Sequence, residues 1–141
     1  MKFKYLEDVA IADIAFEAYG KNLNELFENC GLAVSECMVN IKTIKPKIKK
    51  EIKLESDKLD NLLYDFLSEL VFIKDTEGLL FSKYSISVKE SKKFQMKAIC
   101  SGDKIDRKNQ ELRNDVKAIT MHMFEIKKTG AKYTSRVVVD I

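Results

Sequence analysis

The spacing of apolar residues changes after the second of two helical segments in this chain, and that change limits the folds open to it. Up to about residue 73, two segments carry apolar side chains three and four residues apart, which puts them on one face of a helix. After Gly78 the apolar residues alternate with polar ones or run together over short stretches, as in strands. We therefore predict an α+β fold: a mixed or antiparallel sheet, as one sheet or two small ones, with two amphipathic helices packed on it.

Capping residues locate the two helices, which we place at residues 23–39 and 57–73. Asn22 precedes the first helix and Glu25 follows three residues later, a pattern that caps a helix N-terminus. Either Ser56 or Asp57 is expected to cap the second helix. One or two short strands should precede the first helix, and four strands joined as a meander should follow the second, at residues 79–90, 94–100, 115–127 and 133–141.

Length and cysteine usage indicate the class of protein. The 141 residues correspond to one domain, which we predict to span residues 1–141. No apolar run approaches the ~18 residues of a membrane span, and no signal-like segment opens the chain. The three cysteines form no C-x-x-C pair, so we expect Cys30 and Cys37 to be core thiols rather than disulfide or zinc ligands. These features predict a cytoplasmic protein.

The charged residues leave the question of nucleic-acid binding open. The sequence contains 25 basic and 22 acidic residues, a balance too even to indicate nucleic-acid binding. Residues 42–53, however, hold six lysines and the only proline, and they read as a loop that runs into a half-exposed strand. Those lysines either solvate a sheet edge and prevent aggregation, or contact a phosphate backbone.

The common enzyme motifs are missing from this sequence. It has no glycine-rich phosphate-binding loop, no G-x-S-x-G and no H-E-x-x-H. The only histidine, His122, lies in the middle of a predicted strand, a poor place for a Ser-His-Asp relay. We predict that the protein is not an enzyme.

Two aspartates in apolar strands suggest a metal site instead. Asp13 lies among alanines and isoleucines, and Asp140 follows three valines and precedes Ile141, which has a carboxylate of its own. Burying a lone carboxylate is costly unless a cation or hydrogen bonds compensate. If the two strands are neighbours, the three carboxylates converge and would bind Ca²⁺ or Mg²⁺. Alternatively, each aspartate points to solvent.

Several motifs, in this order, resemble those of the archease family. Asp8-Val-Ala-Ile-Ala-Asp13 is followed by Ala18-Tyr-Gly20, one residue longer than the family's aspartate motif. Helical segments follow as Leu23-Asn-Glu-Leu-Phe-Glu-Asn29 and Leu62-Leu-Tyr-Asp-Phe-Leu-Ser-Glu-Leu70. The second half contains Gly102-Asp103, Val116-Lys-Ala-Ile-Thr-Met-His122 and the terminal Val138-Val-Asp-Ile141.

The resemblance implies a protein that assists the RtcB-type RNA ligase of tRNA splicing. Archeases promote guanylylation of the ligase histidine, allow multiple turnover and broaden the ligase's nucleotide use. The family binds a divalent cation, with Ca²⁺ seen, through residues that correspond to Asp13, Asp140 and Ile141. GTP would then be used by the ligase, and RNA would be contacted indirectly, through the ligase.

Four further residues are candidates for contact with a partner or a phosphate: Asp8, Lys117, Thr120 and His122. Because side chains alternate along a strand, Thr120 and His122 should share one face and Lys117 should lie on the other. Lys117 could equally be a solvated lysine, and His122 could form a structural hydrogen bond. The competing function is an RNA-binding adaptor or general chaperone that uses residues 42–53 and the basic loop residues Lys104, Arg107, Lys108 and Arg113.

Overall fold

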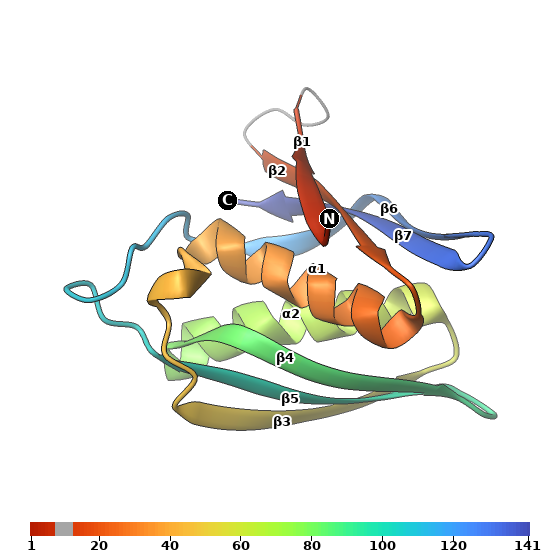
Figure 1. The fold of residues 1–141 in the computed structure, drawn as a ribbon, viewed down its shortest axis with the longest axis horizontal. Helices are drawn as coiled ribbons and strands as arrows, with labels where there is room; N and C mark the ends of the chain where they lie inside the picture. Colours follow the sequence, from red (N-terminus) through yellow and green to blue (C-terminus); the bar gives the residue numbers. More distant parts are fainter. Residues whose placement is uncertain (8–12) are drawn as a thin grey trace.

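Two antiparallel sheets enclose a layer of two helices (Figure 1). The computed structural model describes residues 1–7 and 13–141. Along the chain the elements are β1 (Phe3–Leu6), β2 (Asp13–Gly20), α1 (Leu23–Met38), a 3-10 helix (Ile41–Thr43), β3 (Ile48–Ser56), α2 (Leu59–Glu77), β4 (Leu79–Glu90), β5 (Phe94–Lys104), β6 (Ala118–Thr129) and β7 (Lys132–Asp140). In the described part of the chain, no helix is long and apolar enough to span a membrane.

The α+β prediction is confirmed, but the strands after α2 do not form a meander. One sheet has the order β1-β2-β7-β6 and the other β3-β5-β4, so the β4–β5 and β6–β7 hairpins belong to different sheets. Residues 105–117 carry the chain from one sheet to the other. Alternating hydrophobicity shows that a segment is a strand but not which strand it pairs with, and this is why the connection was predicted wrongly.

The first helix follows its prediction closely. The Asn22 Oδ1 atom accepts the Glu25 backbone N–H at 2.9 Å, as the capping pattern requires. The Glu25 carboxylate reaches back to the N–H of Lys21 at 3.3 Å. Together these two bonds fix the corner where β2 turns into α1.

The second helix differs from its prediction at both ends. It begins at Leu59, and Lys58, at the N-cap, provides no side-chain cap; the Ser56 hydroxyl instead accepts the Lys58 N–H at 3.3 Å. It also continues through residues 74–77, beyond its predicted end at residue 73. The helix ends only where Gly78 takes φ 63°, the left-handed conformation that glycine adopts without strain.

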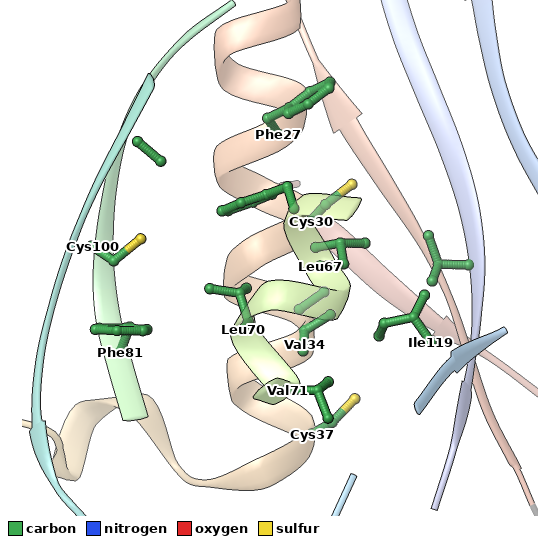
Figure 2. Close-up of a cluster of buried hydrophobic side chains, with 14 of the residues drawn as sticks. Phe27, Cys30, Val34, Cys37, Leu67, Leu70, Val71, Phe81, Cys100 and Ile119 are labelled. Carbon is green, nitrogen blue, oxygen red and sulfur yellow. The ribbon is translucent and has the colours of Figure 1, made fainter. Parts of the chain in front are cut away.

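The core fills the space between the helices and both sheets (Figure 2). Cys30, Cys37 and Cys100 are all buried free thiols, as predicted for the first two. Burial raises the pKa of Cys30 to about 12 and that of Cys37 to about 11. Because the thiolate is the reactive form, these cysteines act as packing groups.

Helix α1 also covers the free edge of β4. The Glu28 carboxylate accepts the N–H of Ile86 at 2.9 Å, and the Asn24 Oδ1 atom accepts the N–H of Val88 at 2.7 Å. Unpaired strand N–H groups attract other strands, so these side chains protect the β4 edge. The opposite edge, β3, includes the second half of the lysine-rich segment, and there Lys49 and Lys53 are exposed.

Gly102 provides a test of the β4–β5 packing. A Cβ atom at this position would lie 1.8 Å from the Leu80 carbonyl oxygen, beside the irregularity in β4 between Phe81 and Lys83. We expect Gly102→Ala to lower the free energy of unfolding by about 3 kcal/mol or more, because backbone atoms must move. Urea unfolding measures the loss.

Gly130→Ala is the matched control. Gly130 has a positive φ, 62°, and nothing lies within 4 Å of a Cβ atom added to it. Only the left-handed conformation is penalised, by about 1–2 kcal/mol. Equal losses for the two variants would contradict the close approach at Gly102.

Candidate functional site

The pairing of β2 with β7 brings the two candidate aspartates together. In this antiparallel pair Asp13 lies directly opposite Asp140, at one end of the ladder. Opposed residues in such a ladder share a face, with Cβ atoms about 4.5–5.5 Å apart. Both side chains are half-buried. The condition on which the predicted site depended, that the two strands are neighbours, is therefore met.

These two aspartates face away from the helix layer. The next residues along the strands, Ile14 and Val139, oppose each other and pack against the core. Because side chains alternate, Asp13 and Asp140 project from the other face. Ala118 and Thr120 of β6, opposite Asp140 and Val138, share that outer face.

The charges of the pair are not balanced by the protein around it. In the described part of the chain, neither Asp13 nor Asp140 forms a salt bridge. Like charges directly opposite each other across a ladder are destabilising. A cation between the two carboxylates would remove that repulsion.

The carboxylate oxygens of Asp13 and Asp140 suit a hard cation, but two side chains provide few metal ligands. Carboxylate oxygens are ligands that Ca²⁺ and Mg²⁺ prefer, with water completing the shell. Within residues 1–7 and 13–141, no three His, Cys, Asp or Glu side chains gather closely enough to hold a metal ion. A third protein ligand would thus be an oxygen of the Ile141 main chain, next to Asp140, or a group from residues 8–12. Asp8 lies outside the described residues.

Besides its pairing with Asp13, Asp140 is held in place by a backbone hydrogen bond from the segment before β6. The N–H of Lys117 donates to the Asp140 carbonyl oxygen at 2.8 Å. Lys117 itself comes just before β6, and its exposed side chain lines a small hollow with Phe72 and Asp75 of α2. Lys117 thus lies outside the β6 ladder, and its face relative to Thr120 stays a prediction.

A buried lysine anchors the segment that leads into Lys117. The Lys74 ammonium, 9% exposed, donates to the Asp115 carboxylate at 2.6 Å and to the Val116 carbonyl oxygen at 2.7 Å. Burial by itself would lower the pKa of Lys74, but hydrogen bonds to Asp115 and Asp75 outweigh it and hold that pKa above its ordinary value. This contact was not predicted, because the second helix was expected to end at residue 73, before Lys74.

The shared face predicted for Thr120 and His122 stays a prediction, because the pairing of β6 with β7 is interrupted after Thr120. Thr120 pairs with Val138 and the next paired residue is Glu125, opposite Arg136. Between them the chain bulges, and Met123 takes φ 56°, which is uncommon for a residue other than glycine. Alternation of faces stops at such a bulge.

His122 is exposed on this bulge. Its backbone N–H donates to the Thr120 hydroxyl at 3.3 Å, and the described residues provide no hydrogen-bond partner for its imidazole. The Arg136 guanidinium braces the bulge by donating to the Met123 carbonyl oxygen at 3.3 Å and to the Glu125 carboxylate at 2.9 Å. The structural hydrogen bond considered for the His122 side chain is therefore not found among the described residues.

Comparison with known proteins identifies the family. A sequence profile of the archease protein family matches residues 3–141. The chain belongs to the archease family. Archease from Sulfurisphaera tokodaii is 39% identical over 140 residues, covering 99% of each chain, and archease from Pyrococcus abyssi is 36% identical, covering 92% of this chain and 93% of the relative.

Solved structures share the fold of this archease. The solution structure of Methanobacterium thermoautotrophicum protein 1598 matches with a TM-score of 0.86 and 34% identity, covering 99% of this chain and 98% of that one. The crystal structure of a Thermotoga maritima archease, described as a possible chaperone, matches with a TM-score of 0.64 and 20% identity, covering 94% and 93%. At that identity the second comparison shows the fold alone.

Repulsion between the paired aspartates can be measured in the absence of metal. In a chelating buffer, Asp140→Asn should raise the free energy of unfolding by about 0.5 kcal/mol, because an amide removes one of the two facing charges. Urea unfolding in excess chelator is the measurement. Asp57→Asn, an exposed aspartate elsewhere, serves as the control. A destabilised Asp140→Asn would contradict the repulsion.

Proposed function

We propose that this archease activates an RtcB-type RNA ligase of tRNA splicing. It would promote guanylylation of the ligase histidine, allow multiple turnover and broaden the ligase's nucleotide use. Family membership over residues 3–141 is the observation that carries the proposal. The three free thiols fit the reducing environment of the cytoplasm, where the protein would act.

The proposed site of action is the outer face at the β2–β7 end. There Asp13, Asp140 and an oxygen of Ile141 would hold Ca²⁺ or Mg²⁺. Such an ion, when bound, offers open coordination positions to a phosphate oxygen or a partner's carboxylate. Two carboxylates that lie opposite each other in the ladder, without a salt bridge in the described part of the chain, support this assignment.

Neighbouring residues have supporting roles in the proposal. Lys117 holds the Asp140 main chain through its N–H, and its exposed ammonium is available to a phosphate or to the ligase. Thr120 shares the face of the aspartate pair. His122, exposed on the bulge, would contact the partner. A contact from Asp8 stays a prediction.

The archease would have no ligase or nucleotide-hydrolysing activity of its own. Its sequence lacks a glycine-rich phosphate-binding loop, so GTP would bind the ligase. RNA contact in this function would also be made through the ligase.

The second candidate function is a chaperone or RNA-binding adaptor. The lysines of residues 42–53 favour the adaptor function, and the Thermotoga maritima archease, which shares the fold, is described as a possible chaperone. The basic loop suits RNA less well than its composition indicated, because Arg113 pairs with Glu36 at 2.6 Å and the Lys104 ammonium donates to the Glu77 carbonyl oxygen. We rank ligase activation first.

Metal binding is the first test. Calorimetry on chelator-stripped protein should show one Ca²⁺ or Mg²⁺ ion per chain. Asp13→Asn and Asp140→Asn should each weaken binding by at least about tenfold, since even an indirect partner of a metal ligand contributes that much. Asp57→Asn should bind like wild type. The absence of binding heat, or an unchanged affinity in Asp140→Asn, would refute the metal site.

Ligase activation is the second test, by single-turnover guanylylation of the ligase at fixed GTP. The archease should increase the rate, while Asp13→Ala and Asp140→Ala should lose the stimulation. Variants are matched by circular dichroism and melting temperature, so lost stimulation reports on the site. Lys42→Ala with Lys45→Ala, which removes two charges elsewhere, is expected to stimulate normally.

Two outcomes would overturn parts of this proposal. Full stimulation by folded Asp140→Ala would remove the metal from the mechanism. No stimulation by the wild-type protein with its cognate ligase would favour the adaptor or chaperone function instead.

A further inference from the structure

The three-stranded sheet β3-β5-β4 has one face packed on the helices and one face open. Ile52, Ala98 and Ile86 lie opposite one another across the three strands, and all are buried. The next residues on each strand therefore project from the other face. Figure 1 shows both helices on the same side of these strands.

The open face is basic and lacks aromatic side chains. Lys49 and Lys83 both lie opposite Ser101, Lys53 lies opposite Lys97, and Lys89 lies opposite Gln95. All five lysines are exposed. Two glutamates share the face, together with small or polar residues and one half-buried isoleucine: Glu51, Glu55, Ser85, Ser87 and Ile99.

Protection of sheet edges does not explain these lysines. Lysines commonly guard an exposed edge, and this accounts for Lys49 and Lys53 on β3. Lys97, however, is on β5, the central strand, and Lys83 and Lys89 are on β4, whose edge N–H groups at Ile86 and Val88 already bond to α1. Lys97 thus has no role at an edge, and the edge N–H groups between Lys83 and Lys89 already have partners.

The arrangement also has an electrostatic cost. Lys53 and Lys97 oppose each other directly, and like charges in that position repel. Among the described residues, only Glu51 offsets the repulsion between these two lysines. One of its carboxylate oxygens lies 3.4 Å from the Lys53 ammonium and the other lies 3.6 Å from the Lys97 ammonium. A polyanion lying on the face would relieve the repulsion more fully.

At one end of the face, the sheet borders a hollow of about 780 Å³ lined in part by Lys49, Lys83 and Ser101. Its helical wall includes Glu25 and Glu28. Both carboxylates already accept backbone N–H groups, Glu25 from Lys21 and Glu28 from Ile86. Each of these two carboxylates thus has a backbone hydrogen-bond donor and keeps its negative charge at the margin of the face.

We propose that this open face binds the phosphate backbone of nucleic acid. Lysine ammonium groups neutralise phosphates as point charges, independently of base sequence. Base stacking requires aromatic side chains, and a protein partner would require apolar or aromatic anchors at the centre of its interface. Besides five lysines and two glutamates the face provides serines and Gln95, and only Ile99 is apolar, so the excess of positive charge without apolar anchors matches a phosphate backbone. This direct contact is additional to the ligase function and independent of it.

The experiment measures binding of a fluorescein-labelled 20-nucleotide oligouridylate by anisotropy at several salt concentrations. If five phosphates are neutralised, the affinity of the wild-type protein should fall about 100-fold between 50 and 200 mM salt. The variant Lys83→Ala/Lys89→Ala/Lys97→Ala retains two lysines of the face. This variant should bind more weakly than wild type, and its affinity should fall by less than about tenfold between 50 and 200 mM salt.

A second triple variant, Lys21→Ala/Lys127→Ala/Lys132→Ala, has the same change in net charge away from this face. It should bind like wild type, which separates a local surface from overall charge. Equal weakening of both variants, or no binding by the wild-type protein at 50 mM salt, would overturn the proposal. Binding of polyglutamate without oligouridylate would also overturn it, since the ligand would then be an acidic polypeptide.

Discussion

Strands β2 and β7 come from opposite ends of the chain, and both the four-stranded sheet and the candidate site depend on their antiparallel pairing. Its register is fixed by burial: Phe16 pairs with Val137 and Ile14 with Val139, and all four face the core. Slipping by one residue would turn these apolar side chains outward. The same register places Asp13 opposite Asp140, so the hydrophobic residues that stabilise the sheet also enforce the closeness of two like charges.

The helices could be predicted from sequence because their signals are local. Apolar spacing and the Asn22 cap act within a few residues of one another, and α1 formed as expected. The start of α2 was less predictable, because Lys58 provides no side-chain cap. Division of the strands between two sheets depends on contacts between distant residues, such as those that place β4 beside α1, and no local pattern encodes these contacts.

For the candidate site, too, the sequence indicated single residues but not the contacts between distant segments. Asp13 and Asp140 stood out because a carboxylate in an apolar strand requires compensation, and the structure places them opposite each other. The position of His122 was beyond sequence reasoning, since alternation assumes an unbroken ladder and β6 bulges around Met123. The Lys74 contact was equally hidden, because it joins α2 to a segment about forty residues later, as the Asp115 bond shows.

The two proposed surfaces lie on opposite sides of the helix layer. The aspartate pair projects from the outer face of the β1-β2-β7-β6 sheet, and the lysines project from the outer face of β3-β5-β4, with α1 and α2 between the two sheets (Figure 1). Since charges farther apart than about 8–10 Å are largely screened at physiological salt, changes on one face should leave the electrostatics of the other nearly unaltered. Metal-dependent contact with a protein and contact with a phosphate backbone could therefore occur on one small protein at the same time, and charge substitutions can separate them.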